Sequence, residues 1–169
     1  MSEIKKLQYY VNGEFKDSKT DKYTDAFNPS TGEVIAKVPC CLPAEVEEAI
    51  AAAKAAFPGW SATPVRKRME VLYRLRDLLI EHREELTASV AYENGKSWTE
   101  AEGDVLKAQE GTEHALTAPS LLMGDSLMDA SRGIDTVMYR EPLGVFAGIV
   151  PFNFPAMIPM GWMTPVCIA

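Results

Sequence analysis

The stretch Gly144–Val150 (GVFAGIV), followed at once by Pro151–Pro155 (PFNFP), decides the fold. A run without a polar side chain, bounded by proline, is typical of a strand that is covered on both faces, as in a parallel sheet. Parallel neighbours are joined by crossovers of about a dozen residues or more. Only residues 151–169 follow Val150, which is enough for one helix and no return strand. We therefore expect an α/β fold in which this chain stops inside a βαβ unit.

The charge-free segment Leu143–Ala169 is also long enough to cross a bilayer. However, it holds a polar residue, Asn153, and it is interrupted by four residues that lack a backbone donor, namely Pro151, Pro155, Pro159 and Pro165. Backbone in contact with lipid does not tolerate such interruptions cheaply. We interpret the segment as buried core with no membrane association, and we expect any helix that begins at Pro155 to be irregular.

Two hairpins are predicted within residues 1–42. The dipeptide Asn12-Gly13 lies between strand-forming residues and suits a two-residue turn in which both positions need positive φ. A second hairpin is indicated by the turn Asn28–Gly32 (NPSTG), which separates the strand-like residues 23–28 from residues 33–38.

Residues 43–122 are predicted to be helical. Pro43 suits the first turn of a helix that Pro58-Gly59 would end. Apolar residues then recur at intervals of three and four from Thr63-Pro64 to Asn94-Gly95, which predicts one longer helix with a glycine C-cap.

The sequence Ser97–Glu100 (SWTE) forms a capping box, which predicts a third helix ending near Leu116. Beyond Gly124 the pattern returns to strand. Alternation within residues 134–142 predicts a strand whose edge is available for assembly with other subunits.

Composition excludes several classes of function. The net charge of −7 leaves no clustered Lys and Arg surface of the kind that nucleic-acid binding needs. The three cysteines, Cys40, Cys41 and Cys167, are odd in number and lack metal-ligand spacing, so a reducing compartment is expected and no metal site. Residues 1–6 are polar and lack the apolar stretch of a secretory signal. We therefore expect a cytoplasmic protein.

Asn153 is the best-placed polar residue for chemistry. It follows the carboxyl end of the expected buried strand, which is where open α/β sheets bind their ligands. A side-chain amide at that place can donate a hydrogen bond to a developing oxyanion. The local sequence alone favours an asparagine that only forms a turn beside proline.

The stretch Tyr139–Met157 (YREPLGVFAGIVPFNFPAM) resembles the aldehyde dehydrogenase superfamily at the end of its first dinucleotide-binding strand. Within the superfamily, Pro119–Gly124 (PSLLMG) together with the Asn153 motif is similar to the methylmalonate-semialdehyde dehydrogenase branch, which is CoA-acylating. Further matches occur in the family's order and extend the resemblance over nearly the whole chain: Val11–Phe15, Asn28–Glu33 and Glu93–Lys96.

This resemblance implies an N-terminal portion of the aldehyde dehydrogenase fold. Residues 1–169 would then be an incomplete NAD-binding domain, in which 143–169 provide the first strand and the start of a helix of a Rossmann-like unit. The strand at 134–142 would bridge subunits of a homo-oligomer, and the catalytic domain would be absent.

The resemblance also implies a reaction. In the family, a cysteine thiolate attacks the aldehyde, hydride passes to NAD, and CoA or water takes the acyl group from the thioester. Asn153 would hold the oxyanion through its side-chain N–H, while Val150, Pro151 and Phe152 would line the cofactor near its ribose and nicotinamide. The family's nucleophile would lie beyond Ala169, so this chain alone is expected to be inactive.

Lys107 is a candidate for substrate binding. The methylmalonate-semialdehyde branch has an arginine, thought to meet the substrate carboxylate, on the helix after the capping box, and our alignment puts Lys107 at that position. Lysine keeps the charge but loses the bidentate fork. The alternative interpretation is an exposed helix residue without a role.

Two other functions remain open from the sequence. One is a non-acylating aldehyde dehydrogenase, for example one acting on succinate semialdehyde. The other is a short, non-catalytic protein that assembles with full-length dehydrogenase subunits through its strand edges.

Overall fold

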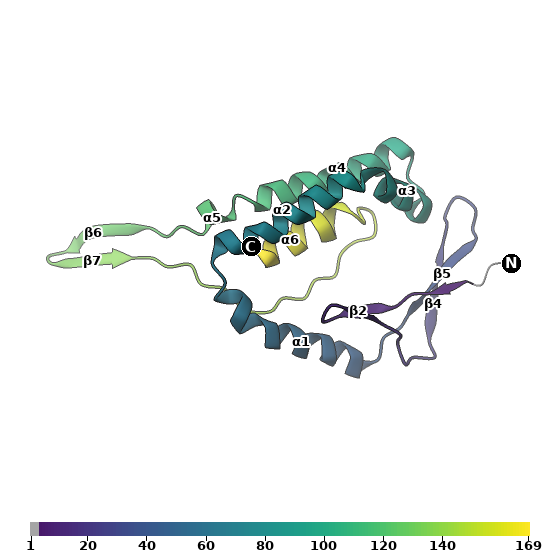
Figure 1. Cartoon of the computed structure of the whole chain (residues 1–169), viewed down its shortest axis with the longest axis horizontal. Helices are drawn as coiled ribbons and strands as arrows, with labels where there is room; N and C mark the ends of the chain where they lie inside the picture. Colours follow the sequence, from purple (N-terminus) through teal and green to yellow (C-terminus); the bar gives the residue numbers. More distant parts are fainter. Residues whose placement is uncertain (1–3) are drawn as a thin grey trace.

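The computed structural model describes residues 4–169, so Met1–Glu3 of the polar N-terminus lie outside the described residues. Figure 1 shows small strands near the N-terminus, a layer of helices that contains the C-terminus, and a hairpin of residues 126–137 that projects far from the rest. The structure therefore contains both strands and helices, as an α/β class requires.

The first predicted hairpin is confirmed. Strand β2 (Tyr9–Val11) pairs antiparallel with β3 (Glu14–Lys16). The turn residues Asn12 and Gly13 have φ values of 52° and 85°, which is the left-handed conformation that a two-residue hairpin turn needs.

The second predicted hairpin is also confirmed. Strand β4 (Tyr23–Phe27) pairs antiparallel with β5 (Val34–Pro39), and within the turn the Asn28 carbonyl accepts from the Gly32 N–H at 2.8 Å. The sequence missed one pairing. Strand β1 (Lys5–Lys6) lies parallel to β5, so the strand order is β1-β5-β4.

Two helix boundaries differ from the prediction. Helix α1 (Pro43–Ser61) continues through Pro58, because proline near the end of a helix removes a single hydrogen bond and one more turn can follow. The predicted long helix is two helices, α2 (Val65–Glu81) and α3 (Arg83–Asn94), with a break at His82 (φ −100°, ψ 18°). Periodicity did not reveal the break, since apolar residues resume in phase after it.

The predicted capping box is confirmed at the start of α4 (Trp98–Ala115). The Ser97 Oγ accepts from the Glu100 N–H, and the Glu100 carboxylate accepts in return from the Ser97 N–H at 3.3 Å. Leu116 is the C-cap, as expected, and the single turn α5 (Ala118–Leu121) follows.

Two contacts tie the N-terminal strands to the helices. Gly95 ends α3 with a φ of 76°, and a Cβ at this position would lie only 2.7 Å from the Pro29 Cγ of the second hairpin turn. The buried Glu45 carboxylate of α1 accepts from the Lys19 N–H and the Ser18 hydroxyl, each at 2.8 Å. The Lys19 N–H contributes most to holding the pKa of Glu45 below its usual value.

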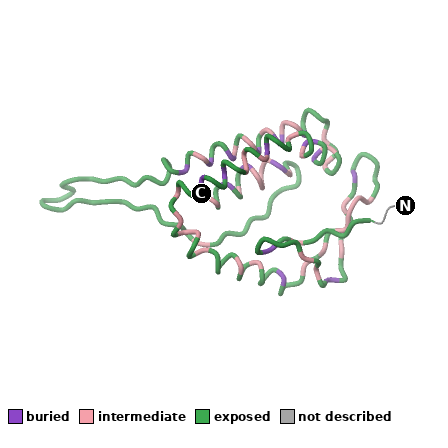
Figure 2. Tube along the Cα trace, viewed as in Figure 1, coloured by how far each residue is buried: buried purple, intermediate pink, exposed green. Residues whose placement is uncertain are grey.

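Helix α4 is the centre of the hydrophobic core, because it packs against α2 and α3 as well as the C-terminal helical segment. Buried residues are concentrated in this helical layer, whereas the chain between it and the projecting hairpin is exposed (Figure 2). One cluster consists of Leu79, Val90, Ala101, Val105, Ala108 and Ala156. A second cluster consists of Met69, Leu72, Ala115 and Ala118.

The C-terminal helical segment is irregular, as predicted. The π-helix η1 (Met157–Met163) runs directly into α6 (Thr164–Ile168). It approaches α4 with no side chain between the two backbones. A Cβ on Gly111 would lie 2.4 Å from the Gly161 carbonyl oxygen, and a Cβ on Gly161 would lie 2.8 Å from the Ala108 Cα.

The projecting hairpin was predicted only in part. Strand β7 covers Ile134–Val137, which is shorter than the predicted 134–142, because residues 138–142 have no strand partner and include Pro142. Its antiparallel partner β6 (Ser126–Ser131) was not predicted. Gly133, with a φ of 75° in the turn, is the signal that could have indicated it.

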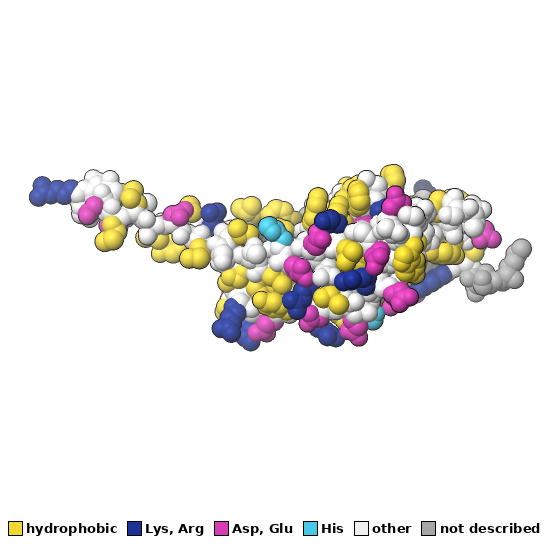
Figure 3. Space-filling view, turned by 90° about the horizontal axis from the view of Figure 1, so that it is seen from above, with side chains coloured by type: hydrophobic (Ala, Val, Ile, Leu, Met, Phe, Trp, Pro, Cys, Tyr) yellow, Lys and Arg dark blue, Asp and Glu magenta, His cyan; other side chains and the backbone are white. Residues whose placement is uncertain are grey.

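The run Gly144–Val150 is not a strand in this structure, which corrects our expectation of a buried parallel strand. It is unpaired, and Leu143 and Ile149 are 90% and 101% exposed. A strand is held by hydrogen bonds to a neighbour, and within residues 4–169 no strand pairs with this run. Hydrophobic side chains are spread among charged ones over the face of the molecule seen in Figure 3. No helix in the described part of the chain has the length and apolar character needed to cross a membrane.

The close approach of α4 and η1 generates a stability prediction. Gly111→Ala should destabilise the fold by about 1–3 kcal/mol, because the added methyl group overlaps the backbone of η1. The matched control is Gly103→Ala on the same helix, where no atom lies within 4 Å and alanine should instead stabilise by about 0.5–1 kcal/mol. Urea denaturation followed by circular dichroism measures both, and equal shifts of the two midpoints would contradict the packing.

Candidate functional site

Asn153 lies in an exposed turn between the unpaired apolar run and η1. Within residues 4–169, no side chain or backbone group is hydrogen-bonded to its amide. The amide is therefore free to donate to a ligand, which is what an oxyanion donor requires.

The residues on either side of Asn153 are fixed by the end of α3. The Asn94 Nδ2 donates to the Phe152 carbonyl oxygen at 3.0 Å. The Lys96 Nζ lies 4.4 Å from the centre of the Phe154 ring, which is within the range of a cation–π interaction. The turn that carries Asn153 is thus held on both sides while its own side chain stays free.

A buried ion pair lies behind this turn. The Lys96 Nζ is 2.9 Å from the Asp104 Oδ2, and the two side chains are 16% and 0% exposed. The other carboxylate oxygen, Oδ1, accepts from the Met157 N–H at 2.8 Å, at the first residue of η1. Asp104 therefore connects α4, the Asn94–Lys96 segment and the start of η1.

Lys107 is one helical turn beyond Asp104 and is exposed. Its Nζ pairs with the Glu110 carboxylate at 2.5 Å, but both side chains are more than half exposed, so this pair contributes little to stability. Lys107 and Phe154 line the same shallow hollow, whose other residues are Lys96, Glu100, Gly103 and Asp104. The structure therefore brings Lys107, the predicted substrate-binding residue, close to Phe154, which follows Asn153 in the sequence.

The three predicted cofactor-lining residues lie in the exposed segment before the turn. Val150 is 38% exposed and Phe152 is 85% exposed, and Pro151 between them is also exposed. Their side chains are apolar and accessible, and none of the three lines either of the two hollows of this structure. The hydrogen bond from Asn94 fixes the last of the three through its carbonyl oxygen.

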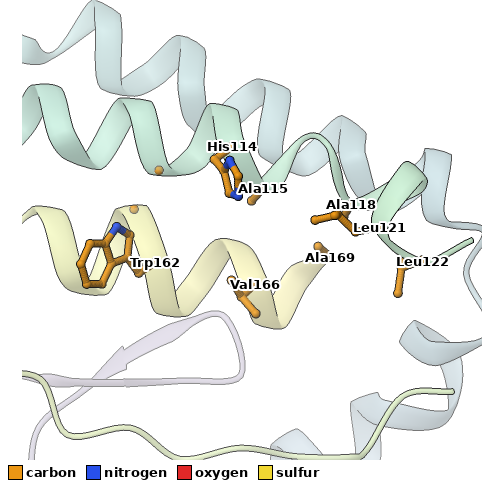
Figure 4. A pocket seen from close by; sticks show the side chains of 10 residues that line it. His114, Ala115, Ala118, Leu121, Leu122, Trp162, Val166 and Ala169 are labelled. Carbon is orange, nitrogen blue, oxygen red and sulfur yellow. The ribbon is translucent and has the colours of Figure 1, made fainter. Parts of the chain in front are cut away.

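A second hollow lies toward the C-terminal end of α4, and Figure 4 shows it. The His114 ring and the Trp162 ring come from the two facing helices, and the remaining lining side chains are apolar: Ala115, Ala118, Leu121, Leu122, Val166 and Ala169, with Gly111 and Gly161. None of the sequence-predicted site residues lines it.

The cysteines and the acidic residues in the described part of the chain form no further candidate catalytic or metal site. All three cysteines are free, and none lines either hollow. Among residues 4–169, no three His, Cys, Asp or Glu side chains come together in a way that could hold a metal ion.

Sequence reasoning missed Asn94, Lys96 and Asp104 as parts of the site. The first two belonged to a segment interpreted as a helix end and a family match. Asp104 carried a signal, since it is an acidic residue between Ala101 and Ala108 on the face of α4 that the structure buries. A charge on an apolar face needs a partner, and this one has Lys96.

Comparison with known proteins gives consistent matches. The aldehyde dehydrogenase family profile matches residues 15–169. A malonate-semialdehyde dehydrogenase of Listeria monocytogenes serotype 4a is 46% identical over 169 residues, which is 100% of this chain and 34% of that protein. The structure of a methylmalonate-semialdehyde dehydrogenase from Oceanimonas doudoroffii has a TM-score of 0.92 at 37% identity and covers 97% of this chain and 33% of that one.

A further solved structure, described as a methylmalonate-semialdehyde dehydrogenase from Sinorhizobium meliloti 1021 in complex with NAD, has a TM-score of 0.90 at 35% identity. It covers 95% of this chain and 33% of that chain. The chain thus spans about a third of the length of its relatives. The predicted α/β class and the resemblance carried by Tyr139–Met157 are confirmed, and the chain belongs to the aldehyde dehydrogenase family.

Proposed function

We propose that these residues form the N-terminal part of an NAD-dependent semialdehyde dehydrogenase that produces an acyl-CoA through a cysteine thioester. The observation that carries the proposal is the free Asn153 amide in a turn whose next residue, Phe154, shares a hollow with Lys107. The names of the relatives, malonate- and methylmalonate-semialdehyde dehydrogenase, support a small aldehyde with a carboxylate as substrate.

The residues of this chain would act by binding and orientation. When a thiolate adds to the aldehyde carbon, negative charge develops on the aldehyde oxygen, and the Asn153 N–H would donate to that oxygen. NAD supplies the hydride acceptor. Val150, Pro151 and Phe152 are apolar and accessible, and they would line its nicotinamide end. We assign the nucleophile to a cysteine outside these residues, because none of the three cysteines lines the hollow beside Asn153.

Lys107 would bind the substrate carboxylate. Its present partner, Glu110, is on the same exposed helix surface, so exchanging one carboxylate for another there costs little. A single lysine supplies charge without the two parallel hydrogen bonds of an arginine. The site would therefore select for a negative charge more than for one particular carboxylate geometry.

The remaining surfaces suit a larger assembly. We propose that residues 143–150 become the first dinucleotide-binding strand once neighbouring strands cover them. The fully exposed strand β7, within the predicted 134–142, would join subunits of a homo-oligomer. The free cysteines favour a reducing compartment, and we propose the cytoplasm.

Asn153→Ala tests the oxyanion role. We define the complete enzyme as a polypeptide that carries this chain together with the remaining length of its relatives, about two thirds. In it, Asn153→Ala should lower kcat about 10²- to 10³-fold, as for other oxyanion donors, and leave the Kd for NAD unchanged. Steady-state kinetics and NAD titration measure the two quantities. A near-normal kcat would refute the assignment.

Lys107→Met tests the substrate class. Losing one charged hydrogen bond should raise the KM of the complete enzyme for malonate semialdehyde about tenfold. The KM for propanal, which has no carboxylate, should not change. Lys107→Arg is the matched control and should retain the low KM. A parallel rise in KM for both aldehydes would show that Lys107 does not recognise the carboxylate.

CoA dependence tests the acylating reaction. The complete enzyme should form an acyl-CoA, identified by mass spectrometry, and NADH production should rise when CoA is added, since CoA removes the acyl group from the enzyme. Free acid formed at the same rate with and without CoA would instead identify a hydrolytic aldehyde dehydrogenase, as in the succinate-semialdehyde alternative.

A further inference from the structure

We propose that Lys96 and Asp104 form a positioning pair that sets the orientation of the Asn153 amide. This inference rests on the proposed oxyanion role of Asn153. Both residues line the hollow that contains Lys107, but their proposed role is to hold the turn that carries Asn153 and not to bind the substrate.

The contacts of the pair hold the C-terminal side of the turn. Lys96 contacts the ring of Phe154, the residue directly after Asn153, at 4.4 Å. Asp104 accepts from the Met157 N–H at 2.8 Å, and therefore fixes the start of η1 three residues further on. On the other side, the Asn94 Nδ2 holds the Phe152 carbonyl oxygen at 3.0 Å.

The Asp104 side chain is fully buried, and the Lys96 side chain is 16% exposed. Both Asp104 oxygens have a partner, one being the Lys96 ammonium at 2.9 Å and the other the Met157 N–H. A buried carboxylate with both oxygens hydrogen-bonded has a single favourable position. If it moved away from either partner, a charged oxygen would lose its hydrogen bond in a region of low polarity. The Asn153 turn is linked to Asp104 through Met157 and Lys96, so its position is fixed as well.

Packing alone does not account for these two residues. An apolar pair of similar volume would avoid the cost of removing two charges from water. However, an apolar pair could neither accept from the Met157 N–H nor place a cation on the Phe154 ring. The ion pair therefore places the turn, which an apolar pair of similar volume could not do.

Placement matters for an oxyanion donor because its hydrogen bond must reach the transition-state oxygen at about 2.7–3.1 Å. A displacement of about 1 Å can reduce the rate about 10²-fold. We therefore expect Lys96→Met in the complete enzyme to lower kcat roughly 10- to 100-fold and to leave KM for the semialdehyde and Kd for NAD near their original values.

A double-mutant cycle separates positioning from a general structural role. If Lys96 acts through Asn153, Lys96→Met should cause little further loss of kcat when Asn153 is already alanine, because non-additivity is the mark of residues that act as a unit. Lys96→Arg keeps the charge and the ring contact and should recover most of the activity. The matched control is Lys67→Met, which removes an exposed ion pair with Glu70 (2.8 Å) and should change nothing.

A second variant distinguishes loss of positioning from misfolding, because Lys96→Met alone leaves the Asp104 charge unpaired and could unfold the protein. Lys96→Met combined with Asp104→Asn removes both charges and keeps an oxygen that can accept from the Met157 N–H. This variant should melt near the original temperature yet show the same loss of kcat.

Two results would overturn the positioning role: an unchanged kcat in a folded variant, or an equal fold-loss from Lys96→Met in the presence and absence of Asn153. If Asn153→Ala alone leaves kcat normal, the oxyanion role itself is wrong and the positioning role falls with it. If Asn153→Ala lowers kcat and Lys96→Met does not, only the positioning role of Lys96 and Asp104 is wrong.

Discussion

The close contact between α4 and η1 is the constraint on which the rest of the structure depends. It requires glycine at Gly111 and Gly161, because a Cβ on either residue would overlap the opposite backbone. The Thr112 hydroxyl lies between two carbonyl oxygens, that of Ala108 in its own helix at 2.9 Å and that of Met160 in η1 at 3.1 Å, and its single hydrogen is shared between them. At the start of the same contact, Asp104 accepts from Met157. Small residues and two side-chain hydrogen bonds thus set where η1 begins, and so where Asn153 lies.

The chain keeps much apolar surface at its exterior. The run 143–150 is accessible along most of its length, and Val46 and Ile50 of α1 are also exposed. Exposed apolar surface on this scale is typical of faces that other parts of a protein cover. The comparison agrees, since the chain spans about a third of the length of its relatives. The described residues are therefore held by a small helical core, while the run 143–150 and part of α1 keep apolar side chains accessible.

Asn153 and Lys107 became candidates from the sequence by different means. A polar residue at the end of an apolar run, among aromatic residues and prolines, marks a ligand position for physical reasons. Lys107 was found only through family resemblance, and its own helix gives no signal. Asn94 and Lys96 were not found, because they contact Phe152 and Phe154, which lie more than fifty residues later in the sequence. Local pattern does not show which distant groups a polar side chain will meet.

Sequence by itself determined the features that depend on near neighbours along the chain. The Asn12-Gly13 turn, the Gly95 cap and the Ser97–Glu100 capping box all follow from backbone conformations and hydrogen bonds within a few residues. Tertiary structure alone decided the break at His82 and the unpaired state of 144–150, because helix bends and strand pairing depend on partners that pattern does not name. It also decided that Lys96 and Asp104 meet behind Asn153, since burying two charges together is favourable only when the surrounding chain has already brought them into contact.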